Sequence, residues 1–159
     1  MKNLITQTRN SKLLLITLLL ATFAMYGCRV TFVPEYDAAL SADIEETSRK
    51  VDWFYLMMLE TTSPENDGRA YNLFASQYVD IEVMLNSLLN QNKIKPLNQN
   101  STRIAEITLE LWQKYKEEHR SDNTLSNGLI KLNRKTFSDL FYAMQVAEKG
   151  KELSTNPPE

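Results

Sequence analysis

The chain has few of the residues from which common catalytic and structural sites are built. Its 159 residues include one cysteine, one histidine and four glycines. One cysteine excludes a disulfide within the chain, and one histidine excludes the paired Glu-x-x-His ligands of di-metal helical bundles. Apart from Gly27, the glycines are Gly68, Gly128 and Gly150, which lie too far apart to form a phosphate-binding loop. The composition therefore predicts no metal and no other cofactor.

The only histidine, His119, belongs to no recognisable catalytic group. Lys116 stands three residues before it, where a metal-binding bundle would need Glu. Because His119 falls near the end of a predicted helix, we expect it to cap that end or to be solvated. Glu106 and Glu110 share a helix face, and like charges at that spacing indicate an exposed edge. No serine has a recognisable base nearby. The sequence therefore predicts a protein that is not an enzyme.

Basic residues are too few for nucleic acid binding. The chain has 18 basic and 20 acidic residues. Three of the basic residues precede residue 13, and without them the net charge is −5. Phosphate backbones are bound by clustered lysine and arginine, so we expect no nucleic acid partner. The densest basic stretch, which holds Lys131, Arg134 and Lys135, is typical of a solvated helix edge.

An apolar run follows the basic start of the chain. Residues 1–12 carry the positive charge, and residues 13–25 read LLLITLLLATFAM. Thirteen residues of helix span about 20 Å, which is short of the roughly 30 Å hydrocarbon core of a bilayer. This pattern is typical of a secretory signal that is removed, and not of a transmembrane helix.

The junction after this run reads MYGC at residues 25–28 and resembles the lipobox of bacterial lipoproteins, in which Gly or Ala precedes the invariant Cys. Gly27 and Cys28 match, and Met25 replaces the usual Leu. The resemblance covers only the leader and its junction. It implies that residues 1–27 are a signal peptide. It also implies that Cys28 becomes the mature N-terminus, with a diacylglycerol on sulfur and usually a further acyl chain such as palmitate.

Lipidation also accounts for a single cysteine in an exported chain. Without lipidation, this cysteine would be a free thiol or form an intermolecular disulfide. Two or three acyl chains give a stable membrane anchor. The alternative is ordinary cleavage after Ala24, which would release a soluble protein with one free thiol. Arg29 follows the cysteine. In enteric-type sorting, Asp at this position favours retention at the inner membrane, so we expect anchoring at the outer membrane.

Four amphipathic helices are predicted in the rest of the chain. We assign residues 28–34 to the lipid anchor and a short tether, residues 35–153 to a helical domain and residues 154–159 to a disordered tail. The predicted helices cover about 35–62, 68–92, 101–119 and 125–152, with Pro34 in the first helical position, Asp67 as cap of the second helix and Asn100 or Ser101 as cap of the third. Short loops between amphipathic helices favour an all-α, up-down-up-down four-helix bundle.

The predicted buried stripes follow helical spacing. They comprise Leu40, Ile44, Thr47, Val51, Phe54 and Met58 in the first helix, Tyr71, Phe74, Tyr78, Ile81, Leu85 and Leu88 in the second, Ile104, Ile107, Leu111 and Tyr115 in the third, and Leu129, Leu132, Thr136, Leu140, Ala143 and Ala147, widened by Phe137, Phe141 and Met144, in the fourth.

Residues 53–59, WFYLMML, interrupt the amphipathic pattern with seven apolar residues in a row. With Phe54 facing the core, Leu56 points nearly to the opposite side of the helix. Either this helix is central and buried all round, or its back meets a partner protein or a membrane surface. The candidate interaction surface comprises Trp53, Tyr55, Leu56 and Leu59.

Two functions remain open at this point. The first is a membrane-anchored, non-enzymatic helical adaptor in the bacterial envelope, with a protein partner. The second is a small binding module that holds an apolar ligand, for which Met57, Met58, Met84 and Met144 could line an adaptable pocket. A cavity of roughly 300 Å³ or more would favour the second function.

Overall fold

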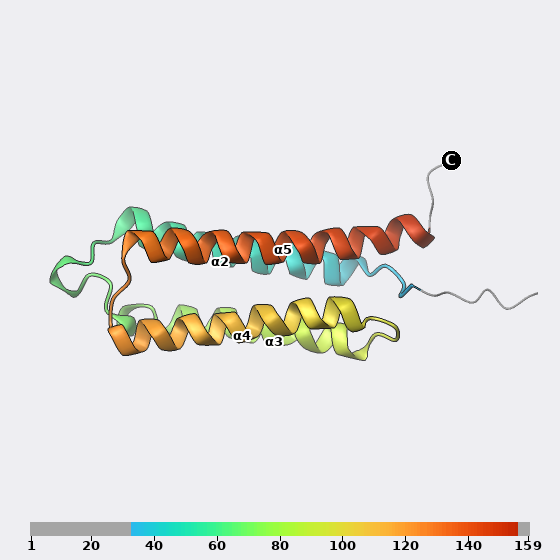
Figure 1. Ribbon diagram of the computed structural model, residues 1–159, viewed down its shortest axis with the longest axis horizontal. Helices are drawn as coiled ribbons and strands as arrows, with labels where there is room; N and C mark the ends of the chain where they lie inside the picture. The colour runs from blue at the N-terminus through green and yellow to red at the C-terminus, as the bar shows by residue number, and fades with distance from the viewer. Residues whose placement is uncertain (1–32, 156–159) are drawn as a thin grey trace, which may run out of the picture. The chain divides into compact units, whose positions relative to one another are not determined.

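The computed structural model describes residues 33–155, and in this range the protein consists of four long α-helices (Figure 1). They are α2 (Ala38–Thr61), α3 (Ala75–Ile94), α4 (Gln99–Asp122) and α5 (Asn127–Thr155). Two short 3₁₀ helices, η1 (Glu65–Asp67) and η2 (Tyr71–Leu73), lie in the connection between α2 and α3. Residues 33–155 contain no strand. The all-α prediction is confirmed. The predictions for residues 1–32 and 156–159 lie outside the described residues.

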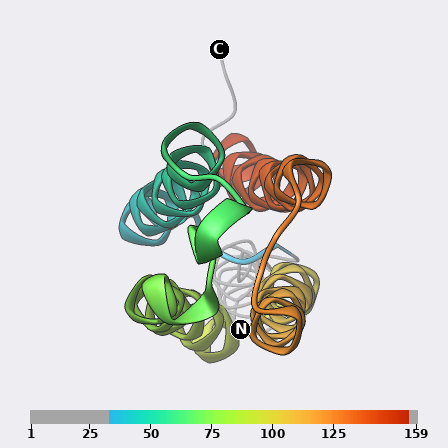
Figure 2. The same ribbon diagram turned by 90° about the vertical axis from the view of Figure 1, so that its left-hand side faces the viewer.

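Each helix packs against two others. The helix α2 contacts α3 and α5, and α4 contacts the same two helices. Viewed along the bundle, the four helices occupy four corners, with the α2–α3 connection and the α4–α5 connection at the near end (Figure 2). Successive helices run in opposite directions (Figure 1). The predicted up-down-up-down four-helix bundle is therefore confirmed.

Aromatic side chains from all four helices fill the middle of the bundle. Phe54 of α2 lies 4.8 Å from Tyr78 of α3 and 5.5 Å from Trp112 of α4, measured between ring centroids. Trp112 lies 5.4 Å from Phe137 of α5. The indole N–H of Trp112 donates a hydrogen bond of 3.1 Å to the backbone carbonyl of Tyr78, so its one polar atom is satisfied. These edge-on contacts join the helices into one core.

The start of the first helix differs from the prediction. Pro34 precedes α2, which begins at Ala38 with Asp37 as its N-cap. The Asp37 carboxylate accepts hydrogen bonds from the backbone N–H groups of Ala39 and Leu40, at 3.0 and 3.1 Å. Asp caps a helix by satisfying N–H groups that have no partner within the helix, and this pairing decides the start.

The second helix begins seven residues later than predicted, and Asp67 does not cap it. Asn66 and Asp67 adopt left-handed backbone angles, and η1 and η2 occupy the segment. The backbone N–H of Tyr71 donates to the side chain of Asn123, 3.0 Å away, in the α4–α5 connection. This bond joins two connections at one end of the bundle. Local helix signals around Gly68 are overridden by such tertiary contacts.

The buried faces of the last two helices are also displaced from the prediction. In α4 the buried residues are Ala105, Thr108, Leu109, Trp112 and His119, while the predicted residues Ile104, Ile107, Leu111 and Tyr115 are only partly buried. In α5, Leu129 and Leu132 are exposed, whereas Phe137, Phe141 and Met144 are buried as predicted, together with Ile130, Asn133, Glu148 and Lys151. The largest aromatic side chains bury the most apolar area, and the faces that carry Trp112 and Phe137 therefore face inward.

Two further predicted helix boundaries were wrong, the start of α4 and the end of α5. The helix α4 begins at Gln99, and neither Asn100 nor Ser101 caps it. The residue before it, Asn98, makes no side-chain capping bond: its Nδ2 donates to Asn92, and its Oδ1 has no hydrogen-bond partner among the described residues. At the other end of the domain, α5 continues to Thr155, so Ser154 and Thr155 belong to the helix and not to the tail.

Candidate functional site

Only part of the candidate interaction surface predicted for α2 is exposed to solvent. Trp53 and Leu56 are exposed, at 52% and 37% of their possible area. Tyr55 is completely buried, where its ring stacks on Phe137 of α5 at 6.0 Å, so its prediction as a surface residue was wrong. Leu59 is half-buried and packs against the core. Only Trp53 and Leu56 therefore remain available to a partner.

A basic groove adjoins these two residues. Asp52 lies one helical turn from Leu56 and accepts two hydrogen bonds from Arg134 of α5, at 2.7 and 3.1 Å. Together with Lys131, Lys135 and Ser138, this pair lines a groove of about 290 Å³. The Arg134 guanidinium is only slightly buried. Its hydrogen bonds to the Asp52 carboxylate raise the pKa of Arg134. The surface combines two apolar side chains with a groove lined by three cationic side chains, of which Arg134 is paired with Asp52 and Lys135 with Asp139, 2.7 Å away.

Arg69 forms a buried polar group at the end of the bundle that holds the α2–α3 and α4–α5 connections. Its guanidinium donates to the Thr62 hydroxyl at 3.1 Å, to the Thr62 carbonyl at 2.9 Å and to the Leu125 carbonyl at 2.9 Å. Desolvation lowers its pKa. Because these acceptors belong to the two connections, Arg69 holds the connections together. We call this end of the bundle, which holds the α2–α3 and α4–α5 connections, the far end.

His119 belongs to the far end, and the prediction that it caps a helix or is solvated was wrong. It is fully buried, with Nε2 2.8 Å from the Arg69 carbonyl oxygen and Nδ1 3.0 Å from the Tyr78 hydroxyl. A carbonyl can only accept, so Nε2 carries the proton and Nδ1 accepts from Tyr78. Desolvation lowers the pKa of His119, against the opposing effects of the Arg69 carbonyl and Asp122. The imidazole is thus held neutral as a structural bridge.

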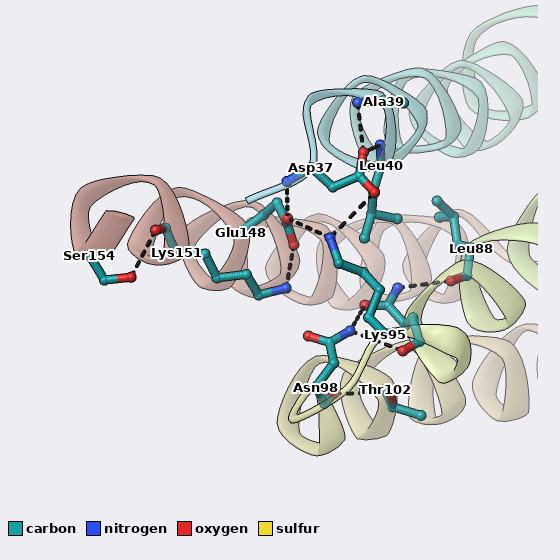
Figure 3. A network of polar contacts seen from close by, with 11 residues as sticks. Asp37, Ala39, Leu40, Leu88, Lys95, Asn98, Thr102, Glu148, Lys151 and Ser154 are labelled. Carbon is teal, nitrogen blue, oxygen red and sulfur yellow. Dashed lines mark hydrogen bonds and ion pairs between the residues drawn. The ribbon is translucent and has the colours of Figure 1, made fainter. Parts of the chain in front are cut away.

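The opposite end carries a charged cluster, shown in Figure 3. The Glu148 carboxylate of α5 accepts from the backbone N–H of Asp37 at 2.9 Å and is paired with Lys151. Lys95, which follows α3, lies 3.3 Å from the Asp37 carboxylate and 3.7 Å from that of Glu148. Chiefly through the hydrogen bond from the Leu40 N–H, the pKa of Asp37 is lowered. We call this the tethered end, because residue 33 enters the domain there.

The α3–α4 connection at the tethered end is held by amide groups. The Asn98 side chain donates to the Asn92 carbonyl at 3.1 Å and to the Asn92 side-chain oxygen at 2.9 Å. Between them, Leu97 adopts a left-handed backbone with φ of 61°. A surface cavity of about 260 Å³ lies beside this connection and is lined by Val33, Pro34, Leu97, Asn98, Asn100, Ser101, Ala147, Gly150 and Lys151.

Sequence reasoning missed both polar clusters, although one signal was present. Glu148 and Lys151 continue the spacing of Phe137, Phe141 and Met144 along α5, so charged residues occupy core positions. Arg69 had no such signal, because it lies in a connection without helical periodicity. Buried ionisable groups indicate either structural pairing or function. In both clusters the partners found are structural.

Other candidate sites are not assembled in the part of the chain that the structure describes. Within residues 33–155, no three His, Asp or Glu side chains lie together in a group that could hold a metal ion. No described helix is both long and apolar enough to cross a membrane. Of the predicted ligand-binding methionines, Met58 and Met144 are packed in the core, and Met84 lines only a surface groove of about 160 Å³. Cys28 lies outside the described residues.

Comparison with protein family models, curated proteins and solved structures gives no match for this chain.

Proposed function

We propose that the protein is a lipid-anchored adaptor of the bacterial cell envelope, attached through Cys28 to a membrane, most simply the outer one, and bound through its helical domain to a protein partner. The observation that carries this proposal is the position of Cys28. The only cysteine of the chain closes an apolar run of signal-peptide length and stands five residues before the first described residue, Val33.

The exposed part of α2 supports the adaptor role. Trp53 and Leu56 present apolar area to solvent beside the groove formed by Arg134 and Asp52. Aromatic side chains and arginine are the residues that dominate the binding energy of protein interfaces. A partner that offers an apolar side chain flanked by a carboxylate would be complementary to this surface.

Lipidation is tested by expressing the full chain in a bacterium and determining the mass of its mature N-terminal peptide. We expect a chain that begins at Cys28 and carries diacylglycerol, and we expect Cys28→Ala to leave the membrane fraction after a carbonate wash. Arg29→Asp is the matched control, since it keeps the cysteine and should remain anchored, but at the inner membrane in an enteric-type host. A Cys28→Ala chain that still sediments, or a wild-type chain with a free thiol, would refute lipidation.

The partner surface is tested separately by placing a photo-crosslinking amino acid at Trp53 or Leu56 in native membranes. Val83, an exposed residue of α3, is the matched control. We expect one discrete protein adduct from the α2 positions and none from Val83. If all three positions give the same adducts, or if the α2 positions give none, this surface is not a specific interface.

A further inference from the structure

The tethered end exposes large apolar side chains. Val33, Ile94, Leu97 and Leu153 are each more than 40% exposed, and Ile94 reaches 81%. They come from different segments: the chain before α2, the last residue of α3, the α3–α4 connection and the last turns of α5. These segments meet at one end of the bundle (Figure 1). Val33 and Leu97 line the same surface cavity there.

Within the isolated domain, the backbone conformation and the exposed side chain of Leu97 are both energetically unfavourable. Its backbone φ of 61° lies in the left-handed region, which costs a side chain with a Cβ about 1 kcal/mol or more. Its side chain is 54% exposed and so recovers little of that cost by burial. Gly or Asn would serve the turn at lower cost. An apolar side chain held outward in this way indicates contact with something outside the domain.

The tethered end is rigid enough to hold these side chains in place. Asp37 precedes α2, Lys95 follows α3 and Glu148 lies in α5, so their contacts join three helices (Figure 3). The side-chain amide of Asn98 donates to Asn92 and closes the connection that contains Leu97. Ile94 and Leu97 therefore project from a braced connection.

The length of chain between the anchor and the domain limits where this end can lie. From Cys28 to Val33 the chain spans five residues, which reach at most about 18 Å when fully extended. The 24 residues of α2 extend for roughly 36 Å. A lipidated Cys28 would thus hold the tethered end closer to the bilayer than the length of the bundle itself.

We propose that the tethered end docks on the lipid bilayer, with Ile94 and Leu97 inserted at the boundary between headgroups and acyl chains. This inference rests on the proposed lipidation of Cys28. The attraction is apolar, since lysines of this end face carboxylates: Lys93 lies 3.7 Å from Glu106, and Lys149 is paired with Glu152. Docking would hold the bundle upright and point the far end away from the membrane.

The test measures the depth of single labelled positions in the full, lipidated chain. The protein is reconstituted into phosphatidylcholine vesicles that contain lipids with a spin label near the top of the acyl chain. Leu97→Cys is compared with Leu73→Cys, because both leucines are 54% exposed but Leu73 lies in η2 at the far end. Each cysteine carries a nitrobenzoxadiazole fluorophore, and lipidation leaves Cys28 without a thiol to react.

We expect a blue shift and at least about a twofold quenching by the spin-labelled lipids at position 97, and neither at position 73. Because the contact is apolar, raising the salt concentration should leave the quenching unchanged. Equal quenching at both positions would show a bundle that lies on its side, and no quenching at either would show a domain held clear of the bilayer. Either result overturns the proposal.

Two controls separate this inference from lipidation itself. Ile94→Cys serves as a second probe should Leu97→Cys alter the turn, and circular dichroism verifies the fold of each variant. The mass of the N-terminal peptide is measured on the same sample. A lipidated chain with an unquenched label at positions 94 and 97 refutes docking alone, whereas a chain without lipid on Cys28 refutes the anchor.

Discussion

The two ends of the bundle are closed by different chemistry. At the tethered end, buried carboxylates and lysines pair with each other, as Glu148 does with Lys151. At the far end, the buried cation Arg69 has no carboxylate partner within residues 33–155 and donates instead to carbonyl and hydroxyl oxygens. Removing one partner of a buried ion pair leaves an unpaired charge, which costs much stability. Removing a donor that is shared by several neutral oxygens costs only the separate hydrogen bonds. The ends should therefore respond differently to substitution.

The largest effect is expected at the tethered end. Glu148→Ala removes the carboxylate that faces both Lys95 and Lys151, so each of these lysines loses one charged acceptor, while Lys95 keeps Asp37 at 3.3 Å. Breaking a buried ion pair in this way costs about 3–5 kcal/mol of unfolding free energy. Urea unfolding measures the loss, and Glu152→Ala, which removes a more exposed carboxylate of the same helix, is the control. A loss below about 1 kcal/mol would show that the cluster contributes little net stability.

At the far end, Arg69→Met should cost less, because an apolar chain of similar length fills the space while the Leu125 and Thr62 carbonyls lose their donor. An unsatisfied buried acceptor costs about 1–3 kcal/mol. The substitution should also loosen the α2–α3 connection, which hydrogen exchange at residues 62–74 would reveal. If protection in that segment matches the wild type while stability falls, the guanidinium does not hold the connections together.

The ends should also differ in their response to mild acid. Burial of His119 in the folded protein disfavours the charged imidazolium and lowers the pKa of His119 from the ordinary value of 6.5. The unfolded chain then binds this proton more readily, and the stabilising effect is present above pH 6.5 and declines as the pH falls below that value. Melting temperatures between pH 7.5 and 5.5 measure the decline. His119→Gln should be less stable throughout, with a flatter profile; an unchanged slope would mean that another group titrates.

The smallest effect on stability is expected from Leu97→Gly. The glycine relieves the left-handed backbone but raises the entropy of the unfolded chain, so the unfolding free energy should change by less than about 1 kcal/mol. In lipid vesicles the same substitution should weaken docking of the tethered end. A large loss of stability would show that the Leu97 side chain is needed within the domain and would contradict its role in docking on the bilayer.

Sequence periodicity predicted the bundle but not the chemistry at its ends. The stripe of α2 that contains Ile44, Val51 and Phe54 is buried as predicted, because an amphipathic helix has one apolar face to bury. In the run at residues 53–59, which is apolar on every face, periodicity directed Leu56 away from the core but could not show that Tyr55 is buried. Only the position of the neighbouring helix α5 decides that burial.

The sequence by itself determined the helical class and the number of long helices in residues 33–155, since these follow from local periodicity and composition. The tertiary structure decided which face of α4 and α5 turns inward, why His119 is neutral, and how Asp37 and Glu148 meet across 111 residues. Such contacts depend on the register between helices. That register is set by close packing of aromatic side chains in the core, a property of the assembled bundle and of no single helix.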